Sequence, residues 1–299
     1  MLDAQSEGIG VWDRDIDRYL HSNRVPIYNP LEEFLFHLPH WDGKDRIHAL
    51  ANRVPCKNPH WELLFHRWFL NMVSHWRGVD KMHANNTSPI LVGRQGTHKS
   101  TFCREMIPPA LRAYYTDSID FSHKRDAELY LNRFALIKVD EVDQITLPQQ
   151  GFLNQILQKP VDNVPEPHGG SGVGLQRYAG FIGTSNQKDL LTDPSGSRRF
   201  ICIEVTGNID TTQPIDYEQL YAQAMHEIHH GERYWFDSED EQIMTENNRE
   251  FEQTPAMLQL FYQYFKTAQT KEEGEFLTPV EILNYLKKKS GMSLSDNKV

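Results

Sequence analysis

The chain has few cysteines and no long apolar run. Its three cysteines, Cys56, Cys103 and Cys202, are odd in number and far apart, which disfavours both a disulfide framework and a zinc ribbon. No stretch of about 18 apolar residues is present, so no membrane-spanning helix is expected. The N-terminus also lacks the basic and apolar regions of a secretion signal. These absences predict a cytoplasmic protein with reduced thiols and no membrane partner.

Positive charge is also scarce, because 31 Lys and Arg residues stand against 41 Asp and Glu residues, for a formal charge of −10. Such a total argues against a simple basic nucleic-acid binder. The excess acid is concentrated in residues 205–299, where 8 basic residues stand against 17 acidic ones. Residues 81–204 have 14 basic and 13 acidic residues, so this region is nearly neutral and can contact nucleic acid locally.

Aromatic residues are plentiful, and the 6 Trp, 12 Tyr and 15 Phe residues exclude a fully disordered chain. In the first eighty residues, apolar side chains recur at helical spacing. The longest stripe, from Trp61 to Trp76, predicts a helix that starts at Asn58-Pro59 and ends at Gly78. Shorter helices are expected at about 11–21 and 30–38, and through Ile47, Leu50 and Val54.

From about residue 89 the pattern changes to short apolar runs bounded by turn residues. These runs cover residues 89–93, 134–139, 178–185 and 200–205, with helical patterns between the first three. Strands that alternate with helices predict an α/β fold with a mainly parallel sheet. We therefore expect three regions: an N-terminal helical region at 1–84, an α/β core at 85–206 and a C-terminal helical region at 207–299. A closing helix capped by Thr278, with Pro279 first, could begin a small DNA-binding module.

A glycine-rich loop with the sequence GRQGTHKST follows the first apolar run. It matches the phosphate-binding pattern G-x-x-x-x-G-K-[ST] except at His98, which replaces the second glycine. Backbone amides of such a loop surround a polyphosphate, while Lys99 would contact the β- and γ-phosphates and Ser100 would ligate Mg²⁺. The predicted cofactors are ATP and Mg²⁺, and the predicted binding residues are Gly93, Gly96, Thr97, His98, Lys99, Ser100 and Thr101.

Two carboxylates, Asp140 and Glu141, follow the second apolar run. At the tip of a buried strand, Asp140 would hold the Mg²⁺ shell and Glu141 would orient or deprotonate the attacking water. A small-molecule kinase has no need of the second carboxylate, so the pair favours hydrolysis over phosphoryl transfer. Taken alone, the pair is also compatible with a solvated turn.

Polar residues also end the third run, where Asn186 could position the water or contact the γ-phosphate. Arg198 and Arg199 stand just before the fourth run. Adjacent residues cannot both face the sheet, so at least one guanidinium is presented outward. It could stabilise transition-state charge across a subunit boundary. A surface salt bridge is the alternative for this pair.

Taken in order, the segments GRQGTHKST, ALIKVDE, RYAGFIGTSN and DPSGSRRF resemble the virulence-associated E (VapE-like) P-loop ATPases of mobile elements. These are similar to superfamily 3 helicases and primase-helicases within the AAA+ class, and the resemblance covers roughly residues 12–250. It implies a ring oligomer of hexamer type that acts on single-stranded or forked DNA in replication of a phage, plasmid or integrated element. It also implies that Asn186 is the γ-phosphate sensor and that Arg198 or Arg199 reaches a neighbour's ATP.

The resemblance places a DNA-contacting loop between the acidic pair and the sensor strand, at about 159–177. This segment contains Lys159, His168 and Arg177, together with a glycine-rich run. A flexible loop with few basic residues can follow a phosphate backbone without reading sequence. A disordered connector is an equally good interpretation, and Arg177 could instead support the nucleotide site.

The sequence HEIHH formally matches the zinc-protease pattern, with His226 and His230 as ligands and Glu227 as base. His230, however, adjoins Gly231, a helix stop that would fray the second ligand. Histidines are also favoured in a last helical turn by the helix dipole. We therefore interpret this segment as a solvated helix end.

Two functions remain open at the level of sequence. The first is an ATP-driven DNA helicase or translocase. The second is a nucleotide-gated, oligomerising regulatory ATPase without unwinding activity, which His98 and the acidic surface favour.

Overall fold

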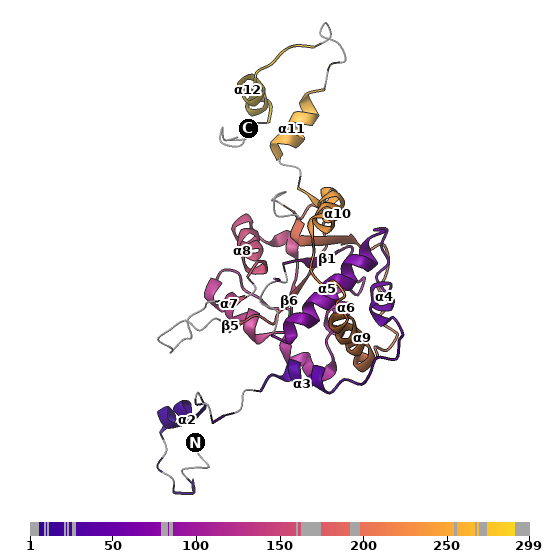
Figure 1. The fold of residues 1–299 in the computed structure, drawn as a ribbon. Coiled ribbons are helices and arrows are strands. Elements are labelled where there is room, and N and C mark those ends of the chain that lie inside the picture. Colours follow the sequence, from indigo (N-terminus) through magenta and orange to yellow (C-terminus); the bar gives the residue numbers. More distant parts are fainter. Residues whose placement is uncertain are drawn as a thin grey trace.

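The structure is a computed structural model that describes residues 6–290 except for 9, 11, 21, 23, 26–27, 79–82, 84–85, 160, 163–174, 192–197, 254–255, 267 and 269–273. A five-stranded sheet lies at its centre, with helices on both sides (Figure 1). The strands of this sheet are β1 (Ser88–Val92), β2 (Tyr115–Thr116), β3 (Leu136–Val139), β6 (Gly180–Ser185) and β7 (Phe200–Glu204). The helices are α2 (Asp13–Leu20), α3 (Pro30–Phe36), α4 (Arg46–Ala51), α5 (Trp61–Trp76), α6 (Lys99–Glu105), α7 (Lys124–Arg133), α8 (Leu147–Leu157), α9 (Tyr217–His229), α10 (Ser238–Asn248), α11 (Ala256–Tyr264) and α12 (Pro279–Ser290).

The strands lie in the order β2-β3-β6-β1-β7, and every neighbouring pair is parallel. The central strand β1 places Ile90 opposite Gly183 of β6 and Cys202 of β7. The prediction of an α/β fold with a mainly parallel sheet is confirmed, and the four apolar runs supply four of these strands. The strand β2 was not predicted, because two residues are too short to show an apolar period.

Alternate residues of the strands face opposite layers of helices, as the pleat of a β-strand requires. Leu91 of β1 packs in a core built with α3, α4, α5, α6 and α9. Its neighbours Ile90 and Val92 pack in a second core built with α7 and α8. The molecule therefore has three layers, and helices from before and after the strands share the first core.

The helix α5 is attached to the sheet by hydrogen bonds as well as by apolar contact. The indole of Trp68 donates to the carbonyl of Phe181 in β6 (3.2 Å), and that of Trp76 donates to the carbonyl of Ala135 (3.1 Å). Buried indole N–H groups need such partners, so both tryptophans fix the helix on the sheet.

The start of α5 differs from the prediction, whereas its end agrees. The side chain of Asn58 accepts a hydrogen bond from the amide of His60 (2.8 Å), which closes a turn that contains Pro59. The helix therefore begins at Trp61. It ends at Trp76, and Gly78 follows with a left-handed φ of 64°.

Arg177 lies just before β6 and is fully buried. Its guanidinium donates to carbonyl groups at the end of α8 and at the start of β6, namely those of Ile156, Leu157, Lys159 and Ala179. It thus takes up carbonyls that a helix C-terminus otherwise leaves unsatisfied. This corrects the interpretation of Arg177 as a nucleic-acid contact: a side chain without solvent exposure supports the fold instead.

A short antiparallel pair, β4 (Val161–Asp162) and β5 (Leu175–Gln176), adjoins this arginine and was not predicted.

Beyond the sheet, α11 and α12 pack against each other through aromatic residues such as Phe265 and Tyr285 (5.3 Å between ring centroids), and in Figure 1 they lie apart from the three layers. Thr278 caps α12 as predicted, since its amide donates to Glu281 and the amide of Glu281 donates to its hydroxyl. In the part of the chain that the structure describes, no helix has the length and apolarity needed to cross a bilayer.

We predict that Arg177→Met lowers the free energy of unfolding by about 2–4 kcal/mol, because the substitution leaves several buried carbonyls without donors. Urea unfolding measures the change. The control is Lys159→Met, which removes a partly exposed ion pair with Glu128 (2.6 Å) and should cost about 1 kcal/mol or less. Equal losses for the two variants would contradict the structural role of Arg177.

Candidate functional site

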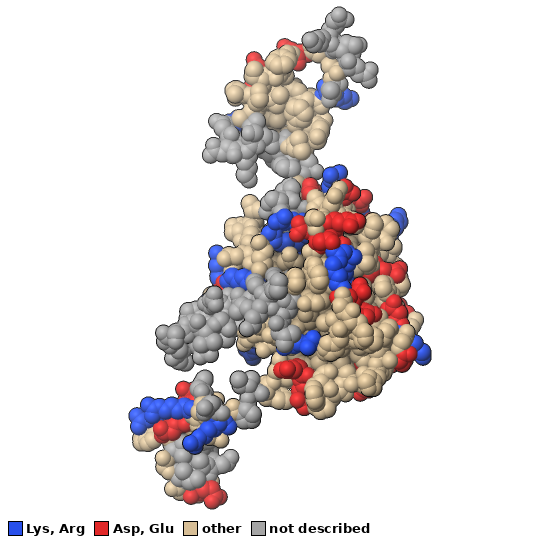
Figure 2. Space-filling view, in the orientation of Figure 1, with Lys and Arg blue, Asp and Glu red and all other residues tan. Residues whose placement is uncertain are grey.

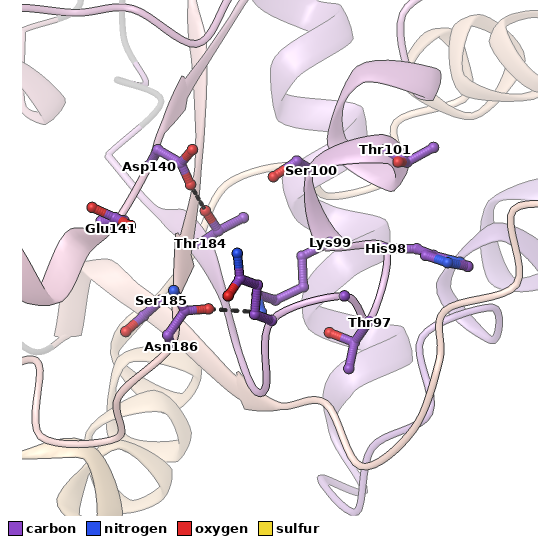
Figure 3. Close-up of a pocket in the computed structure, with 12 residues that line it drawn as sticks. Thr97, His98, Lys99, Ser100, Thr101, Asp140, Glu141, Thr184, Ser185 and Asn186 are labelled. Atoms are coloured by element: carbon purple, nitrogen blue, oxygen red, sulfur yellow. Dashed lines mark hydrogen bonds between the residues drawn. The ribbon is translucent and has the colours of Figure 1, made fainter.

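The carboxyl ends of β1, β3 and β6 lie at one edge of the sheet, because these strands are neighbours and parallel. The loops after them enclose a cavity of about 320 Å³, which is within the range of small-molecule sites. Figure 3 shows this cavity, which is lined by Gln95, Gly96, Thr97, His98, Lys99, Ser100, Thr101, Asp140, Glu141, Thr184, Ser185 and Asn186. The structure therefore brings together three predicted groups that lie up to 90 residues apart in the sequence.

The loop after β1 depends on residues that adopt unusual backbone angles. Gly93 has no room for a side chain, since a Cβ there would lie 3.0 Å from the carbonyl oxygen of Val205. Gly96 and His98 both have left-handed backbones, with φ of 83° and 66°. His98 therefore occupies a conformation that glycine adopts without strain and that histidine tolerates better than most residues. Its imidazole points away from Lys99 and Asp140 (Figure 3).

The ammonium of Lys99 is held beneath this loop. It donates to the carbonyls of Gly93 (2.6 Å) and Arg94 (2.8 Å) and to the side-chain oxygen of Asn186 (3.3 Å). Burial lowers the pKa of Lys99, since desolvation disfavours the charged form. Lys99 and Asn186 therefore meet on one side of the cavity, although Lys99 begins the helix α6 and Asn186 follows the strand β6.

On the other side of the cavity, Asp140 accepts hydrogen bonds from Thr184 and from Lys138 (3.0 Å). Partial burial alone would raise the pKa of Asp140, but these hydrogen bonds outweigh it and hold the pKa below its ordinary value. The carboxylate is thus ionised at neutral pH. Lys138 also donates to the hydroxyl of Ser100 (3.0 Å), so one ammonium links the helix α6 to the end of β3.

Glu141 follows Asp140 and has a left-handed φ of 47°, a conformation that is rare outside glycine. Such strain is concentrated at functional sites, where the surrounding structure holds it in place. Its exposed side chain lines the cavity opposite α6. The next carboxylate, Asp143, accepts from the hydroxyl of Ser185 (2.7 Å) and thereby ties the turn after β3 to β6.

The donor atoms around the cavity fit a hard cation that binds together with a polyphosphate. Ser100, Asp140 and Glu141 supply hydroxyl and carboxylate oxygens, which Mg²⁺ prefers. Among the described residues no group of three or more His, Cys, Asp and Glu side chains is arranged to hold a metal. The two carboxylates and one hydroxyl at the cavity agree with the usual mode of Mg²⁺, which is bound by one or two carboxylates together with substrate phosphates.

Arg198 and Arg199 lie at the amino ends of the strands, on the side of the sheet opposite to the cavity. They precede β7, whose first residue Phe200 pairs with Ser88 at the start of β1, whereas the glycine-rich loop follows the end of β1. A strand of this length spans roughly 16 Å. Neither arginine lines the cavity, and Arg198 forms a half-exposed ion pair with Glu241 (3.3 Å).

The three residues of the predicted DNA-contacting loop differ in their surroundings. Lys159 forms an ion pair with Glu128 of α7 (2.6 Å), and Arg177 is buried at the base of the segment. His168 lies outside the described residues, as does the glycine-rich run around it.

The HEIHH segment is the end of α9 and is used in packing. Glu227 binds His66 of α5 (2.6 Å) and a neighbouring glutamine on its own helix. His226 stacks on His230 and packs at a tilted angle against Trp41, with ring centroids 3.9 and 4.9 Å apart. The carboxylate that a zinc protease would use as its base is thus a hydrogen-bond partner between two helices.

Four residues at the site go beyond the sequence prediction, namely Gln95, Lys138, Thr184 and Ser185. Thr184 was noted only as part of a polar strand end, although its hydroxyl binds Asp140. Lys138 was taken as part of an apolar strand. Its position two residues before Asp140 could have revealed it, because residues i and i+2 of a strand share a face.

Two family models match separate parts of the chain. A family model of the virulence-associated protein E-like domain matches residues 35–253, and a model of a domain of unknown function described from B. Theta (DUF3874) matches residues 254–299. No curated protein matches the chain.

Among solved structures, the A form apo structure of the NrS-1 C-terminal region is 17% identical, with a TM-score of 0.41, and the match covers 73% of this chain and 46% of that one. A second apo structure of the same region is 15% identical, with a TM-score of 0.45, and the match covers 76% and 56%. The chain thus spans about half the length of these structures.

We predict that His98→Gly keeps the free energy of unfolding or raises it by up to about 1 kcal/mol, because glycine adopts the left-handed backbone without a Cβ clash. His98→Val should lower it by about 1 kcal/mol or more, since a β-branched residue is strained there. Urea unfolding measures both variants. Gly96→Ala, at the other left-handed position of the loop, serves as a control that should also destabilise. A loss in His98→Gly as large as in His98→Val would contradict the strain at this position.

Proposed function

This chain belongs to the virulence-associated protein E-like family, and we propose that it is a Mg²⁺-dependent ATPase that drives translocation along DNA or its unwinding. It would work as a ring oligomer in replication of a phage, plasmid or integrated element, as the sequence resemblance implies. The observation that carries this proposal is the convergence of the glycine-rich loop, the acidic pair and Asn186 on one cavity. These are the parts that a P-loop NTPase needs at one place.

In this proposal the loop from Gly93 to Thr101 binds the polyphosphate, and Lys99 exchanges its carbonyl partners for phosphate oxygens. Mg²⁺, when bound with ATP, neutralises phosphate charge, and Ser100 and Asp140 would hold it. Thr184 keeps the carboxylate of Asp140 oriented. Glu141 orients the attacking water or accepts its proton, and Asn186 senses the γ-phosphate.

The place of Arg198 and Arg199 supports a role in a neighbouring subunit. Both precede β7 at the edge of the sheet away from the cavity, so they are remote from the ATP site of their own chain. In a head-to-tail ring, that edge of one copy would approach the cavity of the next. A guanidinium supplied in this way stabilises charge in the transition state.

DNA contact is proposed for the segment between β4 and β5. The antiparallel pair brings the two ends of this segment together, and Lys159 lies beside it with a partly exposed ammonium. The near balance of charge in residues 81–204 allows a few basic groups to act locally.

The second candidate is a nucleotide-gated, oligomerising regulator that does not unwind DNA. The acidic outer surface favours it: Figure 2 shows acidic side chains gathered over α10, where Glu239 and Glu246 are exposed. A surface of this sign repels a DNA backbone.

We predict Mg²⁺-dependent ATP hydrolysis that single-stranded DNA stimulates, measured as phosphate release. Lys99→Ala should abolish turnover because the phosphates lose their cation. Glu141→Gln should keep nucleotide binding and lower turnover by about 10²–10⁴-fold, because the water loses its base.

Absence of DNA-stimulated turnover at concentrations that form a ring would refute the helicase proposal. Separation of a forked duplex distinguishes the two candidates. Turnover without strand separation favours the regulator.

We also predict that the arginines act between subunits. Arg198→Ala or Arg199→Ala should abolish turnover while nucleotide affinity is kept, and mixing that inactive variant with Lys99→Ala should restore part of the activity. In the mixed ring, some interfaces combine an intact lysine with an intact arginine. Arg249→Ala, which removes an exposed arginine beside α10, is the matched control and should remain active. If mixing restores nothing, the trans role of the arginines is wrong.

A further inference from the structure

Lys138 is a buried cation behind the wall of the candidate site, where it contacts two residues that line the cavity without lining it itself. It lies within β3 and is 2% exposed. Its ammonium is 3.0 Å from the hydroxyl of Ser100 and 3.0 Å from a carboxylate oxygen of Asp140. These contacts join the start of α6 to the end of β3, which are 38 residues apart in the sequence.

The position of this lysine is set by the strand. Alternate residues of β3 share a face, so Lys138 and Asp140 both point toward the layer that contains α6, while Ile137 and Val139 pack in the opposite core. A lysine is rarely buried without a partner, since desolvation of its charge is costly. The carboxylate of Asp140 and the hydroxyl of Ser100 offset that cost here.

Ser100 and Asp140 are also the two groups that the proposed function assigns to Mg²⁺. An ammonium that touches both of them stands beside the place a divalent cation would take. Because the ammonium and a Mg²⁺ ion would share these two ligands, they would repel each other strongly in a partly buried site. The ammonium would equally favour the negative charge of a polyphosphate that arrives without metal.

We propose that Lys138 is a built-in cation beside the nucleotide site, whose charge favours metal-free nucleotide and weakens the dependence of nucleotide affinity on Mg²⁺. Lys138 thus acts through Ser100 and Asp140, whereas Lys99 acts beneath the glycine-rich loop. By linkage, a residue that favours metal-free nucleotide lowers the affinity of the nucleotide complex for Mg²⁺ by the same factor. This inference rests on the proposed nucleotide site, but it concerns binding and not turnover.

The test measures the dissociation constant of a fluorescent ATP analogue, once in EDTA and once in saturating Mg²⁺. For the wild-type protein we expect the ratio of the EDTA value to the Mg²⁺ value to be below about tenfold. Lys138→Met removes the charge but keeps the length of the side chain, and should raise this ratio at least tenfold. Titration of the nucleotide complex with Mn²⁺, followed by electron paramagnetic resonance, should show tighter metal binding in the variant.

Two further variants sharpen the result. Lys138→Gln keeps a hydrogen-bond donor without the charge and should also raise the ratio, so it serves if Lys138→Met does not fold by circular dichroism. Lys188→Met is the matched control, because it removes a half-exposed ammonium that pairs with Glu204 (2.7 Å) and not with Ser100 or Asp140. Its ratio should equal that of the wild type.

An unchanged or lowered ratio in Lys138→Met and Lys138→Gln overturns the proposal for Lys138 and leaves the nucleotide site intact. A wild-type ratio above about a hundredfold also overturns it, even if neither variant folds. If the wild-type protein binds no nucleotide in either condition, the proposed function fails and this inference fails with it.

Discussion

The parallel pairing of β1, β3 and β6 is the constraint on which the rest of the molecule depends. Parallel neighbours require crossover connections, and these place helices over both faces of the sheet. Strands covered on both faces are mostly apolar, so most of their polar residues collect where they end. For that reason Lys99, Asp140 and Asn186 reach one cavity from separate parts of the sequence.

The polar groups of the cavity already compensate one another without a ligand. Lys99 is held by two loop carbonyls and Asn186, while Lys138 is held by Ser100 and Asp140. Buried charges persist only with such partners. In the proposed function, a polyphosphate would therefore have to replace existing hydrogen-bond partners of these side chains.

Much of this arrangement could be predicted from the sequence because it follows from local patterns. Apolar runs that end in polar residues indicate parallel strands, and the loop and acidic pair indicate the edge where they meet. The partners of Lys138 could not be predicted, since Ser100 is far away in the sequence and a lysine in a strand more often faces solvent. Arg177 was misread for a similar reason: nothing nearby in the sequence shows that α8 ends against it. The start of α5 depended on the side chain of Asn58, which bonds a backbone amide two residues on and closes a turn around Pro59.

Arg177 also fixes the end of β6 that lies away from the cavity. It joins the last carbonyls of α8 to the start of β6, directly beside the pair β4 and β5, which flanks residues 163–174 in the sequence. From this anchor, β6 runs to the edge of the sheet where the cavity lies. That strand ends at Ser185, next to Asn186 and its hydrogen bond with Lys99. A single strand thus connects the buried arginine with the polar groups of the cavity.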